Sequence, residues 1–197
     1  MKALFLFLFF FSPLAFATTK IVFLGDSLTE GYGIAFERAY PALLQEMFTE
    51  KKMDIEVINA GVSGSTSAGG KSRLRWYLKA KPDIIFIALG ANDGLRGLKI
   101  SQTKQNLEDI ISMALENKLK VIVAGMLLPP NYGETYREEF KQMYEELSKK
   151  YKIIFYPFLL EGVGGEKDLN LADGIHPNEK GHQLMAKKLF PFLKENL

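Results

Sequence analysis

The chain has 197 residues, of which 47% are hydrophobic and 24% charged, so it is long and apolar enough to form one globular domain with a real core. A formal net charge of +2 gives no electrostatic basis for binding nucleic acid or an anionic membrane surface. Cysteine is absent, which excludes disulfides, thiolate catalysis and thiolate metal sites.

The N-terminal residues 1–17 have the pattern of a signal peptide. A basic residue precedes the apolar run 3–11, and Ala15-Phe16-Ala17 fits a small-x-small cleavage site. A retained anchor fits less well, because the stretch from Ala3 to Ala17 is shorter than the roughly 20 residues of a spanning helix and Pro13 interrupts it. We therefore expect residues 18–197 to form a single exported domain without a stable membrane anchor. It would be periplasmic in a Gram-negative source and secreted otherwise.

Five apolar, β-rich runs alternate with amphipathic segments along the rest of the chain. The runs are residues 20–24, 54–58, 83–89, 120–124 and 152–156. The amphipathic segments are residues 35–51, 66–80, 101–117, 134–150 and 178–197. Continuous apolar runs are typical of strands covered on both faces, so the order predicts an α/β fold with a parallel sheet between two helix layers. Ser101 is expected to cap the third helix, and Pro177 to begin the last one.

Polar and glycine-rich motifs follow the predicted strands, where ligands bind in such sheets. Ser27 follows the first strand, Asn59-Ala60-Gly61 the second and Gly90-Ala91-Asn92-Asp93 the third. His176 immediately precedes the last helix. Four separate loops are therefore expected to meet at one edge of the sheet.

Ser27, His176 and Asp173 are the candidate nucleophile, base and orienting carboxylate. Histidine is the side chain whose ordinary pKa suits proton transfer near neutral pH. Asp173 lies three residues before His176 and can accept the imidazole N–H in a tight turn, which fixes the ring tautomer. Alternatively, Ser27 and Asp173 are turn or cap residues. The other histidine, His182, is expected to be a solvated helix residue.

A backbone N–H of Gly61, the side-chain amide of Asn92 and the backbone N–H of Ser27 are the candidate oxyanion donors. Asp26 and Asp93 are expected to fix loops by accepting backbone hydrogen bonds. A metal site formed by Asp173, His176 and His182 is a weak alternative, because their spacing matches no recognised ligand set. We expect neither a metal nor a cofactor.

Other catalytic and nucleotide-binding signatures are absent from the sequence. Gly61-Val62-Ser63-Gly64-Ser65 fails the Gly-x-Ser-x-Gly pattern at its last position. Neither phosphate-binding nor dinucleotide-binding glycine motifs follow the first strand.

The ordered motifs resemble the SGNH or GDSL hydrolases. The matching blocks are Gly25-Asp26-Ser27-Leu28, Gly61, Gly90-Ala91-Asn92-Asp93 and Asp173-Gly174-Ile175-His176-Pro177. Residues 94–97, 130–133 and 173–178 look especially like the bacterial periplasmic thioesterase, lysophospholipase and arylesterase group. The resemblance implies a flavodoxin-like, five-stranded parallel sheet and metal-independent hydrolysis of acyl esters and thioesters, with the roles given above.

In that group, the loop after the fourth strand helps to cover the acyl chain. Here its apolar candidates are Leu127, Leu128, Pro129, Pro130 and Tyr132, although some of them could simply close the core. Residues 28–34 depart from the best-known enteric thioesterase, which leaves the acyl preference open. The expected partner is a small-molecule ester or thioester, and the expected state is a monomer.

Three other functions compete with this hypothesis. The first is a carbohydrate O-acetyl esterase that uses the same three residues. The second is a non-catalytic exported binding protein on the same scaffold, and the third, weaker one is nucleotide or flavin binding.

Overall fold

The computed structural model describes residues 18–197, and the expected signal peptide lies outside this range. Five parallel strands form one sheet in the order β2-β1-β3-β4-β5. The strands are β1 (Thr19–Gly25), β2 (Ile55–Gly61), β3 (Ile84–Ala88), β4 (Lys120–Ala124) and β5 (Ile154–Tyr156). This is the flavodoxin-like order, in which the chain reverses its direction of winding between β1 and β3. The expected sheet is confirmed.

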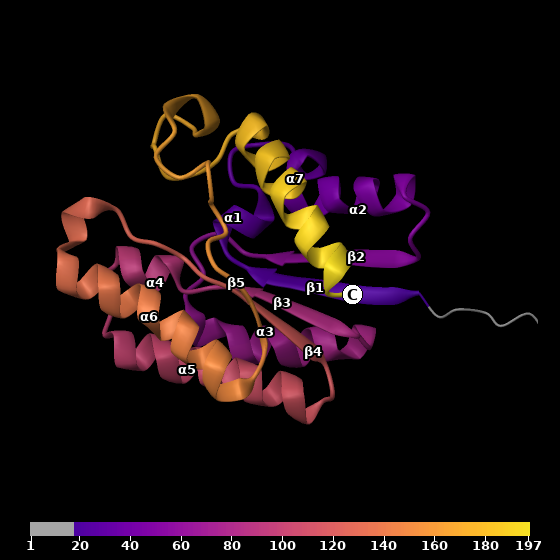
Figure 1. Ribbon diagram of the computed structural model, residues 1–197, viewed down its shortest axis with the longest axis horizontal. Helices are drawn as coiled ribbons and strands as arrows, with labels where there is room; N and C mark the ends of the chain where they lie inside the picture. Colours follow the sequence, from indigo (N-terminus) through magenta and orange to yellow (C-terminus); the bar gives the residue numbers. More distant parts are fainter. Residues whose placement is uncertain (1–17) are drawn as a thin grey trace, which may run out of the picture.

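Helices cover both faces of the sheet, as Figure 1 shows. One layer consists of α2 (Tyr40–Glu50) and α7 (Glu179–Glu195). The other consists of α3 (Gly70–Tyr77), α5 (Ile100–Glu116) and α6 (Glu134–Tyr151). The predicted three-layer α/β architecture is therefore correct. Two short helices at the carboxyl edge were not predicted: α1 (Ser27–Glu30) follows β1, and α4 (Ala91–Leu95) follows β3.

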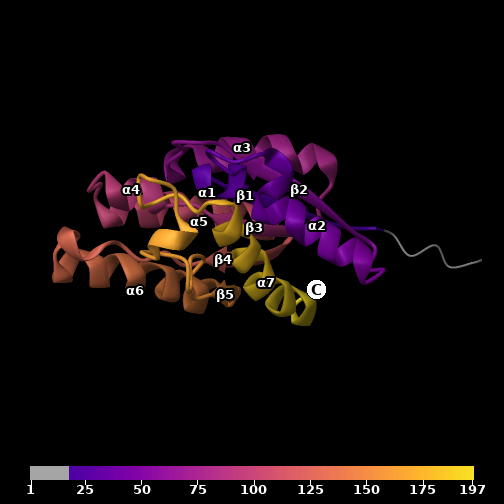
Figure 2. The same cartoon turned by 90° about the horizontal axis from the view of Figure 1, so that it is seen from above.

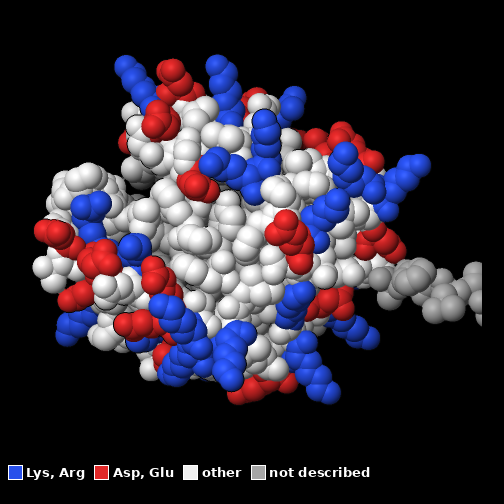
Figure 3. Space-filling model, viewed as in Figure 1, with Lys and Arg blue, Asp and Glu red and all other residues white. Residues whose placement is uncertain are grey.

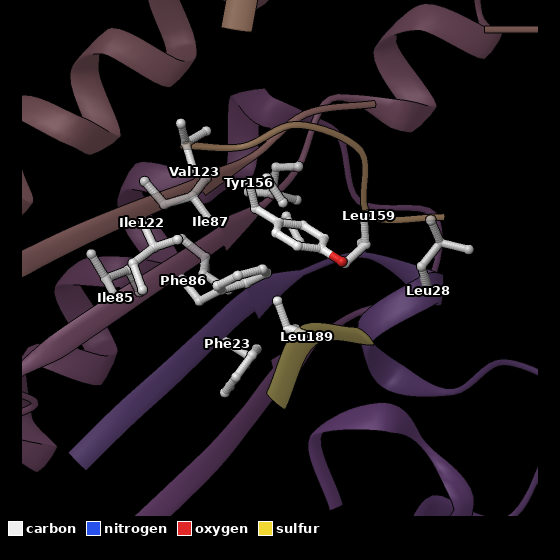
Figure 4. Packing of buried hydrophobic residues seen from close by; sticks show 14 of the residues in the cluster. Phe23, Leu28, Ile85, Phe86, Ile87, Ile122, Val123, Tyr156, Leu159 and Leu189 are labelled. Atoms are coloured by element: carbon white, nitrogen blue, oxygen red, sulfur yellow. The ribbon is translucent and has the colours of Figure 1, made fainter. Parts of the chain in front are cut away.

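The central strands β1 and β3 form the inner core. Every residue of β3 is buried, as are the last five of β1. Phe23 and Phe86 lie on these neighbouring strands with ring centroids 4.9 Å apart (Figure 4). Burying a side chain of this size contributes about 1.5–3 kcal/mol, so the two strands that carry the site's loops are firmly held.

Helix ends differ locally from the predictions. The helix expected over residues 35–51 begins only at Tyr40, with a proline in its first turn, and residues 36–38 form a separate 3₁₀ turn. Ser101 caps nothing, because α5 begins at Ile100 after Lys99. Pro177 precedes the first helical residue by two positions, and the side chain of Asn178 caps α7 by accepting from the N–H of Gly181 at 3.1 Å.

The prediction for His182 is wrong: its side chain is only 1% exposed. Its Nδ1 accepts a hydrogen bond from the backbone N–H of Tyr40 at 3.1 Å, which links α7 to α2. His182 shares the buried face of α7 with Met185 and Leu189, at helical spacings that the sequence already contained. Burial lowers the pKa of His182 from 6.5 to about 4.

This lowered pKa predicts a loss of stability in acid. Folding favours the neutral ring, so the contribution of His182 is complete above pH 6.5 and is lost as the pH falls through about 4. The shift corresponds to about 3 kcal/mol. His182→Asn places an oxygen near the position of Nδ1 but does not titrate. Urea unfolding at pH 7, 5.5 and 4 should therefore show that the free energy of unfolding falls less steeply with pH in His182→Asn than in the parent. An equal decrease in the two proteins would contradict the assignment.

Candidate active site

Ser27 is held at the carboxyl end of β1, as the first residue of α1. Asp26 caps this helix: its side-chain Oδ1 accepts from the N–H of Leu28 at 3.1 Å, and its carbonyl accepts from the N–H groups of Thr29 and Glu30. Within the described residues, the N–H of Ser27 itself has no hydrogen-bond acceptor. This donor therefore remains free beside the Ser27 hydroxyl.

A continuous chain of hydrogen bonds joins Ser27 to His176 and Asp173. His176 Nε2 lies 2.9 Å from Ser27 Oγ, and His176 Nδ1 lies 2.7 Å from Asp173 Oδ2. Residues separated by almost the whole domain meet because α1 and the loop before α7 lie at the same edge of the sheet (Figure 2). This is the geometry of a nucleophile, a base and a group that orients the base.

The Asp173 turn is built to hold the imidazole. Asp173 Oδ1 accepts from the N–H groups of Ile175 and His176, both at 3.0 Å, while Oδ2 faces the ring. Desolvation of the carboxyl favours its neutral form. The hydrogen bonds from the His176 ring and from the two N–H groups outweigh that effect, so the pKa of Asp173 lies below its ordinary value. Asp173 is thus a carboxylate at neutral pH and can accept the proton on Nδ1.

Two further acidic residues near the site, Asp26 and Asp93, fix loops, as expected. Asp26 is 1% exposed, and desolvation raises the pKa of its carboxyl to about 6. Asp93 Oδ2 accepts from the N–H of Ser67 at 2.8 Å, and Asp93 Oδ1 from the Ser67 hydroxyl at 2.6 Å. These two hydrogen bonds between Ser67 and Asp93 tie the loop after β2 to α4, which carries Asn92.

Asn92 lines the cavity beside Ser27, and its side-chain amide has two acceptors at unequal distances. Its Nδ2 donates to the carbonyl of Ser65 at 3.1 Å and lies 3.5 Å from Asp26 Oδ2. A side-chain amide carries two hydrogens. The bond to Ser65 orients the group, and the other hydrogen makes only the long contact to Asp26, which an oxyanion at a normal hydrogen-bond distance can replace.

Gly61 does not occupy the position expected of an oxyanion donor. It is the last residue of β2, paired with Gly25 of β1, and its N–H donates to Asn59 Oδ1 at 2.9 Å. A Cβ at this position would lie 2.1 Å from the backbone nitrogen of Glu30, so the glycine is needed for close packing of β2 against α1. The prediction placed the strand end at residue 58, three residues too early.

Gly64, which sequence reasoning passed over, has the features that Gly61 lacks. It adopts a positive φ of 74° in the loop after β2, and its carbonyl accepts from Arg96 Nη2 at 3.0 Å. Its N–H makes no hydrogen bond to the described residues. The next residue, Ser65, is the one bonded to Asn92, so Gly64 adjoins the side-chain donor.

Arg73 was also missed. Its Nη2 donates to the carbonyls of Gly25 and Ala60 at 2.6 and 2.7 Å, which clamps the ends of β1 and β2 directly behind the Ser27 turn. Burial lowers the pKa of this guanidinium. One of two arginines in a short amphipathic helix carries no sequence signal for such a role.

An apolar cavity of about 430 Å³ opens beside Ser27 and His176. Four of the five residues predicted to bind substrate line it, namely Leu127, Leu128, Pro129 and Pro130. Tyr132 does not line it; its ring packs against the core and its hydroxyl donates to the carbonyl of Leu95 at 2.9 Å. The cavity volume is within the range of small-molecule sites.

Within residues 18–197, no cluster of three or more His, Asp or Glu side chains is arranged to hold a metal ion. In the same part of the chain, no helix combines the length and apolar character needed to cross a bilayer.

Comparison with known proteins places these features in a family. Residues 23–184 match the GDSL-like lipase/acylhydrolase family. The chain belongs to this family. The match runs from β1 into α7 and therefore includes Ser27, Asn92, Asp173 and His176.

Individual known proteins are similar to this chain over nearly its whole length. Esterase TesA of Pseudomonas aeruginosa is 39% identical, over 90% of this chain and 89% of its own. Thioesterase 1/protease 1/lysophospholipase L1 of Escherichia coli K12 is 36% identical, over 98% of this chain and 93% of its own. A crystal structure of TesA superimposes with a TM-score of 0.87 at 39% identity and covers 91% of this chain and 100% of the TesA chain.

Proposed function

We propose that this protein is a serine esterase that hydrolyses acyl esters and thioesters. The observation that carries the proposal is the unbroken hydrogen-bonded series Asp173–His176–Ser27 beside an apolar cavity. Family membership and the esterase and thioesterase names of its relatives support the same reaction class. A binding protein without turnover would have no use for a serine hydroxyl aligned with a base and an orienting carboxylate.

In the first step, Ser27 Oγ attacks the acyl carbonyl carbon while His176 Nε2 takes the hydroxyl proton. Asp173 holds the ring tautomer and stabilises the imidazolium. The oxyanion accepts hydrogen bonds from the Ser27 N–H and the Asn92 amide. We assign the third donor to the N–H of Gly64 rather than Gly61, because the N–H of Gly61 already donates to Asn59.

In the second step, His176 returns the proton to the leaving oxygen or sulfur as the bond from the acyl carbon breaks. A water molecule then attacks the acyl-Ser27 ester with His176 again as base, and release of the acid restores the hydroxyl of Ser27. These two steps use the side chains and backbone N–H groups of the protein and water.

The substrate class is inferred from the cavity lining and from the mixed charges on one face of the molecule. The cavity wall formed by Leu127, Leu128 and Pro129 suits the hydrocarbon of an acyl chain. Acidic and basic side chains are interspersed on the face seen in Figure 3, without a large patch of one sign that would favour a polyanion. We infer a single-chain acyl ester or thioester of modest size.

A panel of p-nitrophenyl esters from acetyl to dodecanoyl, together with octanoyl-CoA and acetylated xylan, tests this proposal. Hydrolysis that persists at octanoyl and longer chains supports it. Activity confined to acetyl esters and acetylated sugar would favour the O-acetyl esterase, and ligand binding without turnover would favour a binding protein.

Asn92→Ala should lower kcat by about 10²–10³, the usual effect of removing one oxyanion donor. The KM for p-nitrophenyl butyrate should change little, because the donor acts mainly on the charge of the transition state. Asn117→Ala is a matched amide control away from the site, because Asn117 follows the last residue of α5 and its side-chain amide donates to the carbonyl of Met113. If Asn92→Ala had the same kcat as the parent, Asn92 would have no role in the mechanism.

We further propose that the protein is exported by its N-terminal leader and acts as a monomer. The pattern within residues 1–17 supports cleavage after Ala17. N-terminal sequencing of the extracellular or periplasmic protein should begin at Thr18, and light scattering should give the mass of one chain.

A further inference from the structure

A shallow groove, separate from the acyl cavity, lies at the end of α1. Glu30, Tyr32, Ile34, Phe36 and Ser63 line it. It shares no lining residue with the cavity, yet both adjoin α1: Ser27 faces the cavity, and Glu30 at the other end of the helix faces the groove. The reacting carbon of a bound ester would therefore lie between two differently shaped surfaces.

The backbone fixes Tyr32 beside the nucleophile. The N–H of Tyr32 donates to the carbonyl of Ser27 at 3.0 Å. The flanking residues Gly31 and Gly33 have φ values of 90° and 79°, which only glycine adopts without strain. A Cβ at Gly33 would also lie 2.5 Å from Leu171 Cδ1. The turn that presents Tyr32 is thus determined by its own sequence.

The ring of Tyr32 lies against the proposed general acid. The centroids of the Tyr32 and His176 rings are 4.5 Å apart, with the planes inclined by 40°. Tyr32 nevertheless remains 51% exposed, and Phe36 in the same groove is 59% exposed. Tyr32 beside His176 and Phe36 in the same groove therefore offer flat apolar surface to a ligand.

The position of His176 decides which part of the substrate meets this surface. His176 Nε2 must reach the leaving oxygen to protonate it, so the leaving group lies beside the imidazole. In the function proposed above, the acyl chain occupies the cavity, whose wall includes the loop after β4. The Tyr32 ring contacts the imidazole and does not line that cavity. A leaving group in place to receive the proton therefore lies within reach of the Tyr32 ring.

We propose that the groove formed by Tyr32 and Phe36 is a leaving-group subsite, which binds flat aromatic alcohols by packing against the Tyr32 ring. The proposal rests on the function proposed above and specifies its second substrate-binding surface. As the bond between the acyl carbon and the aryl oxygen breaks, the proton that His176 took from Ser27 passes to that oxygen, and the phenol leaves along the groove.

Two esters with the same acyl group test the proposal. Phenyl butyrate carries the aromatic leaving group, and trifluoroethyl butyrate carries a small, activated, non-aromatic one. Tyr32→Leu keeps an apolar side chain without a ring, and Tyr32→Phe keeps the ring. Trp76→Leu is the matched control, because Trp76 is an exposed aromatic residue on α3 that lines neither the cavity nor the groove.

Tyr32→Leu should lower kcat/KM for phenyl butyrate by about three- to tenfold, the size of one aromatic pair, and change trifluoroethyl butyrate by less than about twofold. Tyr32→Phe and Trp76→Leu should resemble the parent on both esters. An equal loss on both esters with Tyr32→Leu would mean that the ring only positions His176, and no loss on either would mean that it contacts nothing in the reaction. Both results overturn the subsite.

A failure of the proposed function would look different. In that case the parent would hydrolyse neither ester, or Ser27→Ala would hydrolyse both as well as the parent does. The subsite fails alone when the parent is active on both esters, Ser27→Ala is inactive, and the ratio of the two kcat/KM values is the same in Tyr32→Leu and the parent.

Discussion

Ser27→Ala is expected to lower kcat for p-nitrophenyl butyrate by about 10⁶. The substitution removes only the hydroxyl group, whose oxygen lies 2.9 Å from His176 Nε2. Without it no acyl-enzyme can form, and the remaining oxyanion donors can assist only direct attack by water. Labelling by a fluorophosphonate should disappear in parallel, because that reagent reacts with an activated serine.

The fold of the Ser27→Ala variant should be unchanged, because the cap of α1 is made by Asp26 and by backbone groups. Ser72→Ala is the matched control: Ser72 lies on α3 and its hydroxyl bonds only to the carbonyl of Gly69. A folded Ser27→Ala enzyme that kept ordinary turnover would require another nucleophile, and mass spectrometry of the labelled parent would identify it.

The sequence was sufficient for the sheet and for the positions of Ser27, Asp173 and His176. Buried parallel strands have continuous apolar sequences, which makes them recognisable. Because the carboxyl ends of parallel strands share one edge of the sheet, loops distant in sequence could be predicted to lie close together. The Asp173–His176 pair was also accessible, because a separation of three residues lets one tight turn join the two side chains.

The backbone donor could not be predicted, because the direction of an N–H depends on where a strand ends and on the φ of each loop residue. Two glycines, Gly61 and Gly64, lie in one short stretch. Since β2 continues to Gly61, that glycine stays in the sheet, and the left-handed turn falls at Gly64. Only coordinates distinguish the two.

His182 and Tyr132 show two other kinds of error. The spacing of His182 with Met185 and Leu189 indicates that it lies on the buried face of the helix. Its polar neighbours in sequence indicated an exposed position instead. Tyr132 follows two prolines in a 3₁₀ turn, which directs its hydroxyl to the carbonyl of Leu95 instead of the cavity. No periodic pattern predicts the direction of a side chain in such a turn.

Asp173→Ala is expected to lower kcat by about 10⁴, less than the loss of the nucleophile but more than that of one oxyanion donor. Removal of the carboxylate frees the ring to adopt the wrong tautomer and leaves the imidazolium without its counter-charge. The same substitution removes the acceptor for the N–H groups of Ile175 and His176, so it also loosens the turn.

Asp173→Asn separates these two effects. The amide oxygen can still accept from the two N–H groups in place of Oδ1, while the amide nitrogen would face His176 Nδ1 and donate to it. That bond selects the tautomer with the proton on Nε2, which cannot accept the proton of Ser27. The kcat of Asp173→Asn for p-nitrophenyl butyrate should be as low as that of Asp173→Ala, although the turn of Asp173→Asn is preserved. Asp168→Asn, in the neighbouring segment, is the control. If Asp173→Asn were nearly as active as the parent, Asp173 would act only by shaping the turn, and the orienting role assigned to its carboxylate would have to be abandoned.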